Sequence, residues 1–201
     1  LESLNILGKD LLERLEQEFF TIEDKNLESI KKAISNTFQN PMEGVNYSFA
    51  AGAFVNNILY LFALGNGKAF IKRDGNLGVA LNSASLDPKD VTSSSGFLKD
   101  GDLIVLATEA FSKVITNDEL NLNLNDSLPA EIAESLAPKI HKAENGKISA
   151  IIIKYSNPQI LDQSIGTGAA ASNAADVEEE VVPSPSTHPL KEFLFLIKSR
   201  L

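Results

Sequence analysis

The sequence predicts an α+β fold in which two sheets pack face to face and helices cover them from outside. Two observations predict it. The chain opens with two stretches of helical periodicity, and it continues with apolar runs of strand length separated by turn signals. Apolar strands beside amphipathic helices bury their surfaces well in such layers. The chain has 201 residues, 43% hydrophobic and 22% charged, which is enough for one sizeable soluble core.

Two amphipathic helices are expected at the start of the chain. The apolar face of the first comprises Leu11, Leu12, Leu15 and Phe19. The second follows Asp24, ends near Asn40-Pro41, and has an apolar face made of Leu27, Ile30, Ile34 and Phe38.

Strand periodicity follows the helices. We expect strands at Val45–Val55, Ile58–Leu64, Lys68–Arg73 and Leu77–Leu81. The turn signals between them are Asn56-Asn57, Gly65-Asn66-Gly67 and Asp74-Gly75-Asn76. Because Ile58–Leu64 is almost entirely apolar, we expect that strand to be covered on both faces.

The second half of the folded region alternates between polar and apolar stretches. Residues 82–96 are polar and rich in serine, which predicts an exposed loop. After it we expect a turn at Asp100-Gly101 and a buried strand at Leu103–Ala107. The chain should then form a short helix capped by Thr116, a helix from Ser127 to about Ala143 and a last strand at Lys147–Tyr155. Pro138 should bend or shorten the long helix.

Composition divides the chain into three parts. Residues 1–155 are expected to fold as the domain. Residues 156–189 contain no lysine, arginine or aromatic residue, which predicts a flexible acidic linker. Residues 190–201 are apolar again with basic flanks, and two interpretations stay open. They form a short helix that docks on the domain, or they lead into a membrane segment or partner domain beyond Leu201, in which case the basic flanks suit a cytoplasmic juxtamembrane position.

The charge balance excludes several functions. A net charge of −9 repels nucleic acid and anionic membranes, so no nucleic-acid partner is expected. The chain has no cysteine and two histidines, which excludes disulfides, thiolate zinc sites and multi-histidine metal sites. No apolar run is long enough to span a membrane. The chain starts with Leu1 rather than methionine, and we expect further sequence upstream.

Four stretches in order resemble the PPM-type (metal-dependent serine/threonine) protein phosphatase family. Residues 49–55 stand where that family has a glycine-rich strand, and residues 59–75 resemble its "L-Y-V-A-N-V-G-D-S-R-A-Y-L-x-R-D-G" hairpin. Residues 98–111 resemble its "G-D-x-L-L-L-A-S-D-G-L" strand, and residues 149–155 resemble its closing "T-V-I-V-V-x-Y" strand. The resemblance covers residues 7–155 and implies a four-layer α-β-β-α sandwich, incomplete at its N-terminus.

The resemblance also implies where metal ligands would stand. The family uses two divalent cations held by aspartates in "D-G-H-G-G", "S-D-G" and "D-N" turns, because Mg²⁺ and Mn²⁺ need several carboxylate oxygens. The first turn would precede Leu1. The "G-D-S-R" aspartate corresponds to Asn66, the "S-D-G" aspartate to Glu109, and the "D-N" pair to Gly146 and Lys147. Glu109 is therefore the one candidate metal ligand among these degenerate positions.

Each of these residues also has a structural interpretation that stays open. Glu109 suits a solvated strand end, and Asn66 suits a turn in the left-handed conformation. Asp100 and Asp102 suit the turn around Gly101.

The leading hypothesis is a catalytically silent PPM-like domain, a cytoplasmic pseudophosphatase that binds a protein partner and needs no cofactor. The alternative is an active Mg- or Mn-dependent phosphatase whose first ligand turn lies upstream. An N-terminal-nucleophile hydrolase, which shares the layering, would need Thr, Ser or Cys at its mature N-terminus, and Leu1 cannot serve.

Overall fold

The computed structural model describes residues 2–39, 47–85, 87–125, 127–143, 147–157 and 193–198. Helices are α1 Glu2–Thr21, α2 Leu27–Thr37, α3 Glu109–Val114, α4 Asn117–Asn123 and α5 Pro129–Lys142, with a 3-10 turn at Pro88–Asp90. Strands are β1 Phe49–Val55, β2 Ile58–Leu64, β3 Lys68–Arg73, β4 Asn76–Asn82, β5 Thr92–Phe97, β6 Leu103–Ala107, β7 Ala150–Lys154 and β8 Phe193–Lys198.

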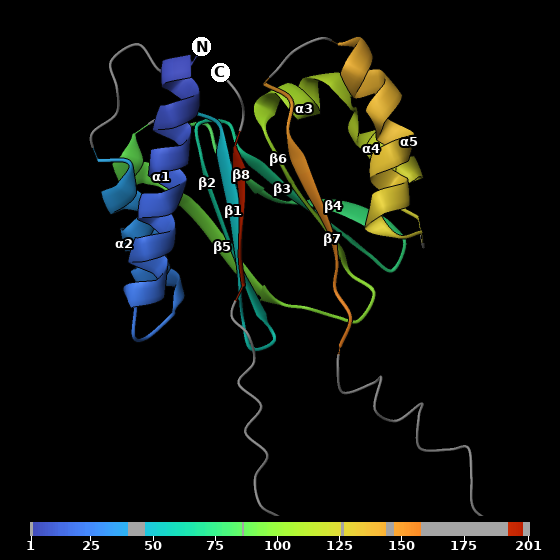
Figure 1. Ribbon diagram of the computed structural model, residues 1–201. Coiled ribbons are helices and arrows are strands. Elements are labelled where there is room, and N and C mark those ends of the chain that lie inside the picture. Colours follow the sequence, from blue (N-terminus) through green and yellow to red (C-terminus); the bar gives the residue numbers. More distant parts are fainter. Residues whose placement is uncertain are drawn as a thin grey trace, which may run out of the picture.

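These elements form four layers. One sheet has the strand order β5-β2-β1-β8 and the other the order β4-β3-β6-β7, and every strand pair is antiparallel. Helices α1 and α2 cover the first sheet, while α3, α4 and α5 cover the second (Figure 1). The predicted fold class is therefore confirmed.

Three apolar layers hold the sandwich together, and the alternation of strand side chains builds them. In β2, Phe62 faces the helices α1 and α2, while Leu61 faces the second sheet. Both are buried, which explains why β2 reads as an almost unbroken apolar run. In β6, Val105 faces the helices α3 to α5 and Ile104 faces the first sheet.

Several predicted elements are confirmed with small shifts. The second helix begins at Leu27, two residues later than Asp24 suggested, because the side chain of Asn26 caps it by accepting a hydrogen bond from the backbone N–H of Ser29 at 3.0 Å. The first strand starts at Phe49 rather than Val45, and residues 40–46 lie outside the described residues. The last predicted strand is confirmed over Ala150–Lys154 only.

The prediction of an exposed loop at residues 82–96 is wrong. Its second half is the edge strand β5, which pairs with β2 from Ile58 opposite Phe97 to Ala63 opposite Thr92. Serine and glycine have weak strand propensity, so the local pattern indicated a loop. The apolar strand β2 needed a partner on that side, and this tertiary requirement outweighed the local preference.

The stretch Gly65-Asn66-Gly67 is a turn, as predicted, but the expected hairpin is wrong. Strands β2 and β3 belong to different sheets, so the chain crosses from one layer to the other at this point. The hairpin that follows is correct. Asp74 and Gly75 have φ of 51° and 77°, the left-handed conformation that tight two-residue hairpin turns require.

The C-terminal segment also differs from expectation. Strand β8 pairs antiparallel with β1, from Phe49 opposite Lys198 to Phe54 opposite Phe193, so a docking helix in residues 190–201 is wrong. Residues 158–189 of the predicted linker, which spans 156–189, lie outside the described residues. None of the helices in the described part of the chain is long and apolar enough to cross a membrane. The lead-in to a membrane beyond Leu201 stays a prediction.

The long helix α5 continues through Pro138 to Lys142, so of the two predicted effects, a bend or a shortening, the shortening is wrong and the bend stays a prediction. Pro138 lies on an exposed face, where the carbonyl that loses its partner can bond to water. Ile132 and Leu136 are buried against the second sheet and hold the helix in place.

The side chain of Glu119, in α4, bonds to a residue of α5, so its ionisation should affect the free energy of unfolding at acid pH. Its carboxylate bonds to the Lys139 ammonium and accepts hydrogen bonds from the Thr116 N–H at 2.9 Å and hydroxyl at 3.0 Å. Together these lower its pKa from 4.5 to about 2, the bond from Lys139 contributing most. Since the folded-state pKa is depressed, this stabilisation is complete above about pH 4.5 and is lost as the pH falls towards 2.

We therefore expect Glu119→Gln to flatten the acid limb of the stability curve. Urea unfolding at several pH values between about 2 and 5 measures it. An acid limb as steep in the variant as in the parent would contradict the assignment. Glu134→Gln, an exposed change on the same helix pair, is the matched control.

Candidate functional site

One end of the sandwich brings together residues that are far apart in the sequence. The Gly65-Asn66-Gly67 turn crosses between the sheets here, and its Asn66 has φ of 65°, which confirms the predicted left-handed turn residue. The Gly65 N–H donates to the Ser85 carbonyl at 2.7 Å, and the Ser83 N–H donates to the Gly67 carbonyl at 3.1 Å. The turn is therefore fixed on both sides.

Glu109 stands at the end of β6, where the helix α3 begins. Thr108 caps that helix, and its hydroxyl lies 3.1 Å from the Lys147 carbonyl and 3.2 Å from the Ser149 carbonyl. The Thr108 N–H also donates to the Ser149 carbonyl at 3.0 Å. These bonds connect the start of β7 to the start of α3, so Glu109 and Lys147 are held at the same end of the molecule.

The carboxylate of Glu109 has a partner on each oxygen. Oε1 forms an ion pair with the Lys113 ammonium at 2.8 Å, one helical turn away. Oε2 accepts a 3.4 Å contact from the amide of Asn66, 43 residues earlier in the chain. The backbone N–H of Glu109 donates to the Ser48 hydroxyl at 3.1 Å, just before β1. The Glu109 side chain is 40% exposed, so the carboxylate lies at the surface of this end.

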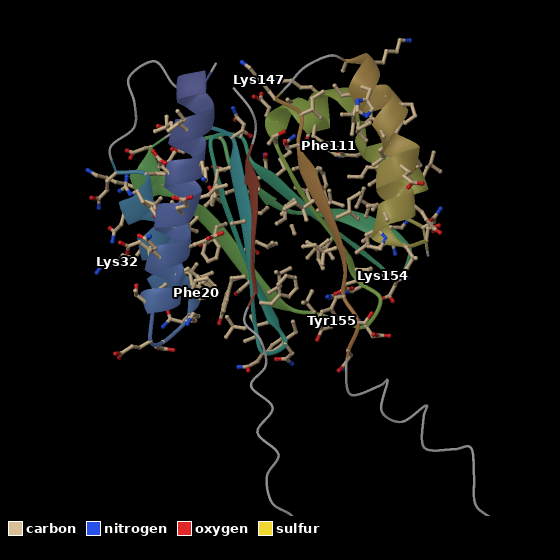
Figure 2. The ribbon with its side chains drawn as sticks, in the orientation of Figure 1. Phe20, Lys32, Phe111, Lys147, Lys154 and Tyr155 are labelled. Carbon is tan, nitrogen blue, oxygen red and sulfur yellow. The ribbon has the colours of Figure 1, made fainter. Side chains whose placement is uncertain are left out.

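Lys147 lies at the same end. Figure 2 shows it where β7 begins, beside α3 with its Phe111, whereas Lys154 and Tyr155 lie at the opposite end of that strand. The Lys147 residue is exposed. Gly146, the other half of the predicted pair, lies outside the described residues. The structure thus brings Asn66, Glu109 and Lys147 to one end of the sandwich, as their positions in the resemblance implied.

This set of groups does not fit a dinuclear Mg²⁺ or Mn²⁺ centre. Such a centre needs several carboxylate oxygens, and here one carboxylate stands beside an amide and an ammonium. Among the described residues, no group of three or more Asp, Glu or His side chains is placed to hold a metal ion. The Lys113 ammonium already forms an ion pair with Glu109 Oε1, so part of the charge that would attract a metal ion is neutralised.

Comparison with solved structures identifies the architecture. The chain superposes on PppA, a regulatory component of the type VI secretion system of Pseudomonas aeruginosa, with a TM-score of 0.59 and 11% identity over 75% of this chain and 80% of that one. The serine/threonine phosphatase PstP of Mycobacterium tuberculosis gives a TM-score of 0.59 and 16% identity over 78% and 83%. A further structure, the PstP catalytic domain in complex with two manganese ions, gives a TM-score of 0.60 and 14% sequence identity. The match covers 76% of this chain and 82% of that one. The chain has the fold of the PPM-type phosphatases.

Comparison with solved structures finds the PPM-type fold, whereas comparison with family models and curated sequences finds no match. Identities of 11% to 16% show the fold only, because the same fold can carry different functions.

Sequence reasoning missed three residues of the site: Ser48, Thr108 and Lys113. A signal existed for Lys113, because a glutamate four residues before a lysine on a helix forms an ion pair. That signal applies only within a helix, and the sequence pattern did not predict α3. Thr108 also had a local signal, since threonine is a common N-cap residue. Ser48 acts through a contact between distant segments, and nothing local in the sequence indicates it.

Proposed function

We propose that this domain is a pseudophosphatase: a PPM-type fold without phosphatase activity that serves as a regulatory or protein-interaction module. The observation that carries the proposal is the pairing of Glu109. Its two oxygens bond to Lys113 and Asn66, where the resemblance to the family implies metal ligands. A protein partner in the cytoplasm, with no cofactor, belongs to the same proposal.

Electrostatics supports this proposal. A divalent cation is held by the charge of its ligands, and the interaction weakens as anionic ligands are replaced by neutral or cationic groups. The Lys113 ammonium lies 2.8 Å from Glu109 Oε1, and its positive charge opposes the approach of a metal ion to that oxygen. Lys147 adds a second positive charge to the same end of the molecule.

The alternative is an active Mg- or Mn-dependent phosphatase with a further ligand turn before Leu1. Glu109 favours it, because a carboxylate is retained at this position and is 40% exposed. The structure of PstP with two manganese ions concerns a protein of the same fold. The two hypotheses differ in whether Glu109 binds a metal ion.

Calorimetric titration of the full chain with Mn²⁺, together with hydrolysis of p-nitrophenyl phosphate, tests the proposal. We expect no Mn²⁺ binding that depends on Glu109 and no turnover above buffer with Mn²⁺ present. Glu109→Gln should therefore leave both measurements unchanged. Glu134→Gln, an exposed change on α5, serves as the matched control.

A binding isotherm that disappears in Glu109→Gln but not in the control, accompanied by turnover, would overturn the proposal and establish the active alternative. Lys113→Met sharpens the test, since it frees the carboxylate from its ion pair. If Mn²⁺ binding appears only in Lys113→Met, this lysine is the group that suppresses metal binding.

A further inference from the structure

A cavity of about 300 Å³ lies between the two sheets, beside the edge strands β4 and β5. Its apolar wall is formed by Leu59 and Leu61 of β2 and by Ile71 of β3, which all belong to the layer between the sheets. Sites for small molecules in proteins have volumes of about 300–1,000 Å³. The cavity is therefore large enough for a small organic molecule.

The sequences of the two edge strands leave this space open. In β5, Ser94 and Gly96 pair with the two leucines of β2, so both positions face the second sheet. In β4, Gly78 pairs with Ile71 and faces the same layer, and Ala80 lines the cavity. No heavy atom comes within 4 Å of a Cβ added at Gly96. Because these four residues are small, the apolar side chains of β2 and β3 stay uncovered here.

Two polar groups on the cavity wall have hydrogen-bonding capacity left. Arg73 donates to Asp102 from Nε at 2.8 Å and from Nη2 at 2.6 Å, and Nη2 also donates to the Phe97 carbonyl at 2.8 Å. These bonds fix the guanidinium, and Nη1 donates to no residue in the part of the chain that the structure describes. The Ser94 hydroxyl likewise has no hydrogen-bond partner within that part. A fixed N–H donor and a hydroxyl are thus available to a ligand.

The charge on this wall is balanced, and the balance selects the class of ligand. The carboxylate of Asp102, which is 1% exposed, already neutralises Arg73. A ligand carboxylate would lose its hydration without meeting a net positive charge, whereas a neutral acceptor such as an amide carbonyl loses much less. Water is held poorly against the apolar wall, because a buried water molecule needs two to four polar partners. Displacing such water with an apolar group favours binding.

We propose that this cavity binds a small, uncharged and mostly apolar molecule that carries one hydrogen-bond acceptor, such as an aliphatic amide. The apolar body of the ligand packs on the leucines of β2, and its acceptor bonds to Arg73. The proposal is independent of the metal question, because the cavity is lined by none of the residues Asn66, Glu109 or Lys147.

Octanamide is a probe of this class, and an amide ¹H–¹⁵N NMR titration of the full chain measures its binding. We expect a dissociation constant of about 1 mM or lower, within the free energy per atom that small ligands reach. The chemical-shift changes should be concentrated at residues 59–61, 71–73 and 94–98. Octanoate has the same chain with a carboxylate in place of the amide. It should bind about tenfold more weakly or worse, because Asp102 already neutralises Arg73.

Two variants of β5 locate the binding. Gly96→Leu places a side chain in the open space without the strain of a positive φ, and it should weaken octanamide binding about tenfold or more. Ser95→Leu is the matched control, because Ser95 pairs with Tyr60 on the helix-covered face and the same side chain is then added outside the cavity. Its dissociation constant should stay within about twofold of the parent value. Urea unfolding checks that both variants fold.

Four outcomes would each overturn the proposal. Octanamide would cause no shifts at the cavity residues, or octanoate would bind as tightly as octanamide. Gly96→Leu would bind octanamide like the parent protein, or Ser95→Leu would weaken binding as much as Gly96→Leu.

Discussion

Replacing Gly67 with alanine should strongly destabilise the domain, because a methyl group at this position would overlap the backbone of β1. A Cβ built at this position would lie 1.8 Å from the carbonyl oxygen of Phe49 and 2.6 Å from its carbonyl carbon. Both are backbone atoms, so no side chain can rotate away to make room. We expect a loss of about 3–5 kcal/mol, a large part of the stability of a domain this size.

The clash at Gly67 follows from the way the chain crosses between the sheets. The turn passes directly over the first residue of β1, and relieving the overlap means moving either β1 or the start of β3. Asn66 precedes Gly67, so the same movement would disturb its contact with Glu109 at the site. Urea unfolding at 25 °C measures the loss.

Gly96→Ala is the matched control for Gly67. Gly96 lies in β5, and no heavy atom comes within 4 Å of a Cβ added there. We expect a change within about 0.5 kcal/mol, because surface substitutions without a steric conflict have small effects. Equal losses in the two variants would show that the turn is not tightly packed against β1.

The layered fold could be predicted because its signals are local. The helical spacing of Leu15 and Phe19 and the apolar run of β2 each report burial directly. The residues Asp74 and Gly75 likewise predict the tight turn, because both residue types tolerate positive φ. Such signals need no knowledge of distant residues, so the elements that depend on them, such as α1, β2 and the β3–β4 hairpin, matched the structure.

The elements that escaped prediction depend on partners distant in sequence. Strand β5 gains its conformation from β2, and β8 gains its own from β1. The paired residues of β1 and β8 are 139 to 149 residues apart in the sequence, from Phe54 opposite Phe193 to Phe49 opposite Lys198. In the candidate site, the positions of Asn66, Glu109 and Lys147 came from the ordered resemblance to a family. The ion pair of Glu109 with Lys113 could not be predicted in this way, because the helix α3, which brings the two residues together, was not expected.

The ion pair between Arg73 and Asp102 should provide the second large effect. It lies at the end of the sandwich opposite the candidate site, where Asp102 is 1% exposed. Its carboxylate accepts hydrogen bonds from Arg73 Nε at 2.8 Å, from Arg73 Nη2 at 2.6 Å and from the Lys99 N–H at 2.8 Å. The hydrogen bond from Arg73 to Asp102 raises the pKa of the arginine above its ordinary value.

Asp102→Ala removes the acceptor of three hydrogen bonds at once. We expect a loss of about 2–3 kcal/mol, below the usual cost of breaking a fully buried pair because the Arg73 side chain is 34% exposed and can recover some hydration. Asp102→Asn keeps the size but places an amide where the carboxylate faced the guanidinium, and it should lose nearly as much. Urea unfolding at neutral pH measures both variants.

A double-mutant cycle separates the pair from the rest of the turn. Arg73→Ala alone leaves a buried carboxylate with the Lys99 N–H as its remaining partner among the bonds described, so it should also destabilise the protein. Removing both residues leaves no unpaired charge, and the double variant should lose clearly less than the sum of the single losses. Losses that add would show that Asp102 stabilises the turn through the Lys99 backbone and not through Arg73. In that case the arginine would be a surface residue held by the Phe97 carbonyl, to which it donates at 2.8 Å.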